Sequence, residues 1–267
     1  MFLPSTIDLG QSEKYSLSIR ISADRFMFSI SDPQDRKNYC LRETELPLGT
    51  SLLESIKRIV FDFNFLTQQY SQTNVVIVSS EYDLVPREYY DHNMRKEMDD
   101  FVHWNNAGQI LSAESSGGEY ITMYNIDKDL YEFLSRNLYA PLFYHHSYLL
   151  VNYVESQVNS ALSKMFVYSH DGMFDVLSYV GEKLTHALSY REAASSDQAY
   201  YILKLWENCG LNQLSDTLYI AGDFDESIVS VLQKYIKKIE KVGAFSDIYL
   251  WSEDAQKAPL DLLSLSV

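Results

Sequence analysis

The chain has 267 residues, of which 22 are Lys or Arg and 37 are Asp or Glu, giving a formal net charge of −15 and a pI near 4.7. Nucleic-acid phosphates and anionic membranes both attract an excess of cations, so neither is an expected partner. No apolar run is long enough to span a bilayer, and Met1–Pro4 lacks the basic start of a signal peptide. Cys40 and Cys209 lie outside any CxxC or Cys/His cluster. These features favour a soluble, cytoplasmic protein with two free thiols.

The first part of the chain shows the order of three strands, a helix and a fourth strand. Apolar and polar residues alternate in the first two strands, and the short polar turn Ser22-Ala23-Asp24 joins them, as expected of a β-hairpin. Thr50 or Ser51 can cap the helix. The fourth strand is rich in β-branched residues, which is typical of a strand buried on both faces. The expected elements are strands at 15–21, 26–30 and 39–41, a helix at 51–66 and a strand at 75–78.

The segment 86–125 interrupts this order, and we interpret it as an insertion after the fourth strand. It holds a charged helix, expected over 86–104, and a turn at Gly117-Gly118. An alternative stays open at this point, because 109–125 can also supply the fifth strand of the first half. The first half then continues with a helix at 127–138, an extended segment at 141–144 and a helix at 147–158.

The second half repeats the order of the first. Its helix begins at Ser195 or Ser196 and ends near Gly210, and Pro259 is expected to open a last helical turn. The other expected elements are strands at 165–168, 173–180, 184–190 and 218–221, a helix at 226–242 and a strand at 245–251.

A short echo supports a duplication. Ile77-Val78-Ser79-Ser80-Glu81-Tyr82-Asp83 and Ile220-Ala221-Gly222-Asp223-Phe224-Asp225 each close an apolar run. A βββαβαβα unit present twice, with an insertion in the first copy, resembles the actin-like ATPase superfamily, which includes FtsA and PilM. The chain also looks like a bacterial family assigned this fold without a known activity. The resemblance covers nearly the whole chain and implies an α/β protein of two ribonuclease-H-like subdomains, 1–160 and 161–267.

The resembled superfamily binds nucleotide phosphates with two hairpin turns, each an Asp followed by a glycine-rich loop. Gly172-Met173-Phe174-Asp175-Val176 is similar to the Gly-Thr-Phe-Asp-Val ending of such a loop, but Tyr168 stands where the family has Asp. The turn at Ser22-Ala23-Asp24 has no glycine, and Asp223 replaces the second glycine of the family's adenosine motif. The resemblance implies an ancestral nucleotide-binding cleft formed by Asp24, Asp171, Gly172, Asp175, Gly222 and Asp223.

Side chains in place of these glycines block close approach of the backbone to phosphate, and added carboxylates repel it; no P-loop is present. We therefore expect no catalytic residue, no metal and no cofactor. The leading hypothesis is a catalytically silent actin-like protein that acts as an interaction scaffold or assembly adaptor for another protein. The alternative is a divergent ATPase or phosphotransferase that binds ATP and Mg²⁺ through Asp171, Asp175, Gly222 and Asp223. A third hypothesis is an unrelated α/β binding protein. The oligomeric state is not indicated by the sequence.

Four further motifs suggest a functional site, and each also has a simpler structural interpretation. Ile7-Asp8-Leu9-Gly10 matches the family's first phosphate signature, but no strand can precede it, so we interpret it as a chance match. The adjacent His145-His146 point to opposite faces of a strand, and His170-Asp171 lacks the other ligands of a metal site. The pair Tyr89-Tyr90 in the inserted segment favours a protein interface or packs against its own core.

Overall fold

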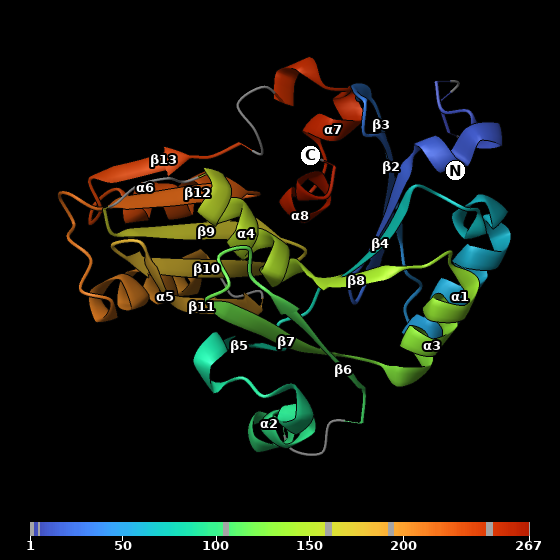
Figure 1. The fold of residues 1–267 in the computed structure, drawn as a ribbon. Helices are drawn as coiled ribbons and strands as arrows, with labels where there is room; N and C mark the ends of the chain where they lie inside the picture. The colour runs from blue at the N-terminus through green and yellow to red at the C-terminus, as the bar shows by residue number, and fades with distance from the viewer. Residues whose placement is uncertain are drawn as a thin grey trace. The chain divides into compact units, whose positions relative to one another are not determined.

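The computed structural model describes residues 3–4, 6–103, 107–157, 162–191, 195–243 and 248–266. The chain divides into two compact units (Figure 1): a first unit of Met1–Asn152 with Ser246–Val267, and a second unit of Tyr153–Phe245. The sequence-based boundary near residue 160 assigned 246–267 to the second subdomain, whereas this segment packs with the first unit. Within the described ranges, no helix combines the length and apolar character that crossing a membrane requires.

The first unit contains a five-stranded sheet with the order β3-β2-β1-β4-β8. The first three strands pair antiparallel, and β4 and β8 run parallel to β1. The strands are β1 Ser16–Ile21, β2 Arg25–Asp32, β3 Asp35–Glu45, β4 Gln72–Ile77 and β8 Leu142–His145. This is the ribonuclease-H-like strand order, and β8 settles the open question of the fifth strand.

Both faces of this sheet are covered. Leu17 and Ile19 of β1 lie on the face that packs against α1 (Leu52–Asp62) and α3 (Lys128–Asn137). Met27 and Val76 lie on the opposite face, with Leu149 of α4 (His146–Gln157) and Leu262 of α8 (Leu260–Ser264). Alternate residues of a strand point to opposite faces, so the period-two pattern in the sequence serves both cores. Ser51 caps α1 as expected, since its side chain accepts a hydrogen bond from the Glu54 amide.

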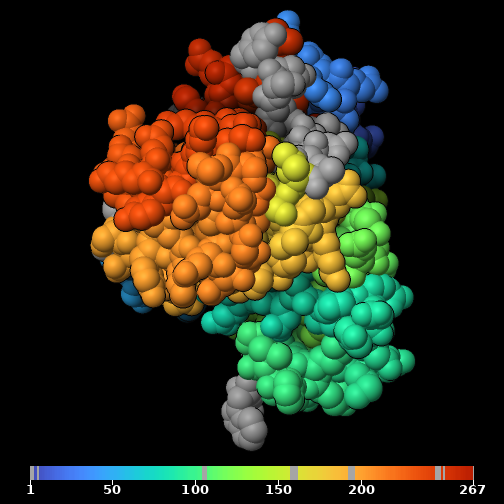
Figure 2. All heavy atoms as spheres, turned by 90° about the vertical axis from the view of Figure 1, so that its left-hand side faces the viewer, coloured from blue at the N-terminus to red at the C-terminus, as the bar shows by residue number. Residues whose placement is uncertain are grey.

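The inserted segment forms a small lobe, residues 82–126, which we call the inserted lobe (Figure 2, teal to green). Its antiparallel sheet has the order β5-β7-β6, with β5 Tyr82–Pro86, β6 Gln109–Glu114 and β7 Tyr120–Ile126. The helix expected over 86–104 is shorter: 3-10 turns at Arg87–Tyr89 and His92–Met94 precede α2, Arg95–Val102. The expected turn is confirmed, because Gly118 has a positive φ of 72° and its amide bonds the Ser115 carbonyl.

The second unit repeats the strand order, as β11-β10-β9-β12-β13. Its strands are β9 Lys164–His170, β10 Met173–Val180, β11 Lys183–Arg191, β12 Thr217–Gly222 and β13 Lys238–Lys241. Helices α5 (Ser195–Asn208) and α6 (Glu226–Leu232) cover one face, where Ile202, Trp206 and Ile228 join the core. The opposite face holds Phe166, whose ring lies 6.3 Å from that of Tyr153.

Two expectations for the end of the chain were wrong. The helix expected over 226–242 stops at Leu232, and Lys238–Lys241 instead pairs with β12 as the fifth strand. Apolar residues at 228, 232, 236 and 239 imitate helical spacing, but pairing with β12 decides the structure. Of the strand expected over 245–251, the part from 248 to 250 is a 3-10 helix, and 245–247 lie outside the described residues.

The C-terminal segment 248–266 covers the free edge of β3. Ser252 Oγ donates to the Tyr39 carbonyl at 2.8 Å, and the Leu41 amide donates to Asp254 Oδ2 at 3.1 Å. These bonds satisfy edge groups that would otherwise be open to another strand. Deeper in the sheet, Arg20 of β1 pairs with Asp261 of α8, and both are almost fully buried. Pro259 opens α8 as expected.

Candidate functional site

Five of the six predicted site residues gather at one end of the second unit's sheet. Asp171 and Gly172 form the turn between β9 and β10, and Asp175 follows on β10. Gly222 at the end of β12 pairs with Ser169, and the Asp223 amide donates to the Ser169 carbonyl at 3.0 Å. The sixth residue, Asp24, lies in the first unit, in the corresponding turn between β1 and β2. The five residues of the second unit lie at the carboxyl ends of the parallel strands β9 and β12. In α/β proteins, ligands commonly bind at this edge of a parallel sheet.

The turn between β9 and β10 is a two-residue hairpin. His170 pairs with Met173, so only Asp171 and Gly172 form the loop, and their φ angles are 44° and 65°. Positive φ at both central residues characterises the type I′ hairpin turn, for which Asp-Gly is a preferred sequence. Backbone geometry thus accounts for both residues. A loop of this length leaves no run of free amides to wrap a phosphate.

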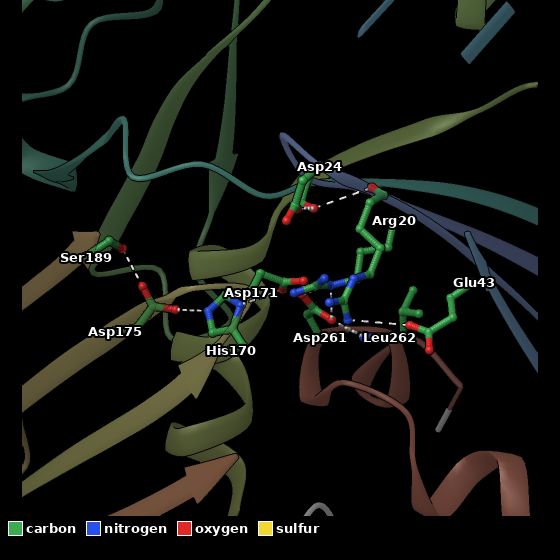
Figure 3. A network of polar contacts seen from close by, with 11 residues as sticks. Arg20, Asp24, Glu43, His170, Asp171, Asp175, Ser189, Asp261 and Leu262 are labelled. Atoms are coloured by element: carbon green, nitrogen blue, oxygen red, sulfur yellow. Dashed lines mark hydrogen bonds and ion pairs between the residues drawn. The ribbon is translucent and has the colours of Figure 1, made fainter. Parts of the chain in front are cut away.

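His170, which the sequence analysis set aside, is the centre of the polar contacts at this turn. Its ring is buried, with Nδ1 2.9 Å from Asp171 Oδ2 and Nε2 2.7 Å from Asp175 Oδ2 (Figure 3). Ser189 Oγ donates to the other oxygen of Asp175. The ring also stacks on Tyr168, the residue at the family's Asp position, at a centroid distance of 4.5 Å. These side chains form a buried polar network at the turn between β9 and β10.

A signal for this network was present in the sequence. Because Asp171-Gly172 specifies a two-residue hairpin, it fixes the register in which His170 faces Met173. Asp175, two residues beyond Met173, then lies diagonally across from His170 on the same face of the sheet. In the next pair of strands, Asp175 lies directly opposite Ser189. The turn chemistry therefore sets the contacts, although the sequence motif alone suggested a phosphate loop.

The geometry of the network does not activate a nucleophile. In a Ser-His-Asp triad, the serine hydroxyl donates to the imidazole, which then removes its proton. Here the carboxylate of Asp175 stands between Ser189 and His170, so the hydroxyl bonds the acid instead. Both ring nitrogens of His170 contact carboxylate oxygens, and both can donate only when the imidazole carries its second proton. The arrangement ties the hairpin turn to β10 through the His170 ring.

Gly222 is required for a packing reason. Its φ is +81°, and a Cβ at this position would lie 2.0 Å from the Ser169 carbonyl oxygen. The close approach of β12 to β9 thus explains the glycine without a ligand. The equivalent place in the first unit is Ile77, because Val78 donates to the Ile21 carbonyl as Asp223 does to that of Ser169. The sequence echo begins at Ile77 in one copy and at Ile220 in the other, so the structure aligns the two copies in a different register.

The turn in the first unit is equally short. The Ser22 amide donates to the Arg25 carbonyl at 3.0 Å, and Ser22 Oγ donates to Asp24 Oδ1 at 2.9 Å. Asp24 is exposed and acts as a turn residue. The tetrapeptide at 7–10 has no strand before it in the described residues; Asp8 caps a 3-10 helix and accepts from the Gly10 amide.

Comparison with solved structures identifies the fold. A Bacteroides thetaiotaomicron protein with an actin-like ATPase fold and unknown function superposes with a TM-score of 0.83 at 24% identity, covering 97% of this chain and 98% of that chain. The PilM-PilN type IV pilus biogenesis complex matches with a TM-score of 0.59 at 11% identity, covering 94% and 96%. The expectation of an actin-like ATPase fold is confirmed.

A search of curated proteins found no match. The model of one protein family, described as a protein of unknown function (DUF3822), matches residues 4–239. This range includes the first five-stranded sheet, the inserted lobe and the second five-stranded sheet as far as the start of β13, so the match is not limited to one unit. The chain therefore belongs to the DUF3822 family.

Proposed function

We propose that this protein is a catalytically silent member of the actin-like fold that acts by binding another protein. One observation carries the proposal: where the resemblance to the actin-like superfamily implies a glycine-rich phosphate loop, the chain has a two-residue hairpin with the His170–Asp175–Ser189 network. A phosphate group needs backbone amides or cations at close range. Asp171, Asp175 and Asp223 instead bring carboxylates to this end of the sheet, which opposes a polyphosphate.

The inserted lobe supplies a surface suited to a protein partner. Exposed apolar side chains gather there: Phe101 is 91% exposed, Tyr89 71% and Val102 57%. A groove of about 480 Å³ lies between α2 and the lobe's sheet, lined in part by Leu84, Met98 and Met123. Apolar surfaces of this kind mark binding sites. Of the tyrosine pair, Tyr89 is open to a partner, whereas Tyr90 is half-buried and its hydroxyl donates to Ser112 Oγ at 2.8 Å.

Charge narrows the class of partner. Residues 82–126 contain eight Asp or Glu against three Lys or Arg, so the groove lies in an acidic lobe. An apolar segment flanked by Lys or Arg complements such a surface, because complementary charges speed association and exclude acidic competitors. PilM, which shares the fold, is found in a complex with PilN. The proposal places the protein in the cytoplasm, in keeping with its free cysteines.

The experiment has two arms. Calorimetric titration with ATP and ADP, with and without Mg²⁺, is expected to show no binding, and phosphate release is expected to stay at background. Mg²⁺-dependent turnover that disappears in Asp175→Asn, but not in the exposed control Asp129→Asn, would contradict catalytic silence and support the divergent ATPase. A photo-crosslinking residue at Phe101 is expected to capture a basic protein in cells, and the same probe at Leu48, 99% exposed outside the lobe, is expected to capture none. Equal capture at both positions would rule out the lobe as the docking surface.

A further inference from the structure

A second cluster of ionisable side chains lies inside the inserted lobe. Asp99 of α2 and His103, which ends that helix, are four residues apart and so lie on the same helix face. Asp83 reaches them from β5, with its Oδ2 2.9 Å from His103 Nε2. One ligand atom from each of the three residues lies within 4.8 Å of the others. The strand β5 and the helix α2, which are separate in sequence, thus bring three potential metal ligands close together.

Asp99 is the member of this cluster that calls for an explanation. It is 2% exposed, and its Oδ2 accepts one long bond, 3.4 Å, from Asn125 Nδ2. In the part of the chain that the structure describes, Oδ1 has no hydrogen-bond partner, and no Lys or Arg pairs with this carboxylate. Burial raises the pKa of Asp99, and the nearby Asp83 raises it further, against a lowering by His103. Burying a carboxylate with so little compensation is costly.

We propose that Asp83, Asp99 and His103 bind a divalent transition-metal ion of the Zn²⁺ type, with water completing its coordination. One imidazole and two carboxylates are a donor set that Zn²⁺ accepts, and three protein ligands leave a position open. Ca²⁺ and Mg²⁺ fit less well, because both prefer sets made of oxygen only. The amide of Asn125 then serves to orient the Asp99 carboxylate, a usual role for a residue behind a metal ligand.

A metal ion here would fasten α2 to β5. Asp83 also lines the groove between these elements, together with Glu97 and Met98 of α2. The ion would therefore fix the distance between the two walls of the groove and set the position of Phe101. This inference does not depend on the proposed scaffold function, because the ligands are not part of the site in the second unit.

The test is metal binding by the full-length protein and its variants. Zn²⁺ affinity is measured by competition with a chromogenic chelator, and the ligand field is read from the visible absorption of the Co²⁺ form. The wild type is expected to bind one equivalent in the micromolar range or tighter. Asp99→Asn and His103→Ala are each expected to weaken binding at least tenfold and to lose the Co²⁺ bands. Asp100→Asn removes an exposed acid from the same helix and is expected to change neither reading.

Stability in the absence of metal separates a ligand from a merely structural residue. Without Zn²⁺, Asp99→Asn is expected to have a Tm equal to or above that of the wild type, because it removes a buried charge. Added Zn²⁺ is expected to raise the Tm of the wild type and of Asp100→Asn, but not of Asp99→Asn. Unchanged Zn²⁺ affinity in the Asp99→Asn and His103→Ala variants, or no stoichiometric binding by the wild type, would overturn the proposal.

Discussion

At the scale of single residues, the same amino acids that suggested a phosphate site have backbone and packing explanations. Asp171 and Gly172 supply the two positive φ angles of a hairpin turn, and Gly222 permits β12 to approach β9. His170 then uses the position that this turn creates to bridge two carboxylates. Turn geometry and strand packing are thus sufficient to account for these residues.

Gly222 provides a direct check of this explanation. Gly222→Ala is expected to lower the free energy of unfolding by about 3 kcal/mol or more, because the new Cβ meets the Ser169 carbonyl and the φ angle is also unfavourable. Gly210→Ala is the matched control: its φ is +66°, but nothing lies within 4 Å of the added Cβ, so only about 1–2 kcal/mol of backbone strain is expected. Urea unfolding of both variants measures the difference. Equal losses of unfolding free energy in the two variants would show that the close approach of β12 to β9 is not the reason for the glycine at position 222.

At the scale of elements, the short C-terminal helices decide how the first sheet is finished. The segment from Ser252 to Asp261 bonds the edge strand β3 and reaches Arg20 on β1. Arg20 Nε lies 3.0 and 2.8 Å from the two oxygens of Asp261, and both side chains are buried. This buried ion pair holds α8 against the sheet, while Leu262 adds apolar contact on the same face.

Removal of Asp261 is expected to be severe. Asp261→Ala should lower the free energy of unfolding by about 3–5 kcal/mol, since it leaves the buried guanidinium of Arg20 without this carboxylate. Glu132→Ala is the matched control, because Glu132 pairs with Arg136 at 2.7 Å on an exposed helix surface, where such pairs contribute about 0–1 kcal/mol. Chemical unfolding and limited proteolysis of the C-terminal segment provide the measurements. Similar losses in both variants would mean that the buried pair does not anchor α8.

At the scale of the whole molecule, two units of equal strand order differ in what is added to them. Only the first unit carries the inserted lobe and the returning C-terminal segment. Buried tyrosines stabilise both units: Tyr39, Tyr70 and Tyr124 in the first, and Tyr153 in the second. Burial raises the pKa of each of them, that of Tyr153 to about 12.

These shifts predict that the protein loses stability in alkali. The folded state holds the tyrosine protons more tightly than the unfolded chain, whose tyrosines ionise near pH 10. Their contribution is therefore complete below about pH 10 and is lost as the pH rises toward 12. Urea unfolding across this range should show a falling free energy, with buried tyrosines ionising only as circular dichroism is lost. Tyr153→Phe should make the free energy of unfolding fall less steeply with pH. Tyr200→Phe, at an exposed position, should leave this slope unchanged. Smooth ionisation of all tyrosines without unfolding would contradict this expectation.

The elements whose boundaries depend on neighbours along the chain were predictable. Alternation marked β1 and β2, the β-branched run marked β4, and caps at Ser51 and Pro259 marked helix starts, because each signal acts over a few residues. The duplicated order of these elements was sufficient to indicate the actin-like fold.

What only the tertiary structure decided depends on contacts between residues far apart in the chain. Lys238–Lys241 is a strand because β12 offers it an edge, in spite of its helical spacing. The segment 248–266 completes the first unit because Arg20 and the edge of β3 receive it. His170 meets Asp175 only after the hairpin sets their register. Local sequence carries periodicity and caps, whereas pairing and burial are selected by the free energy of the assembled core.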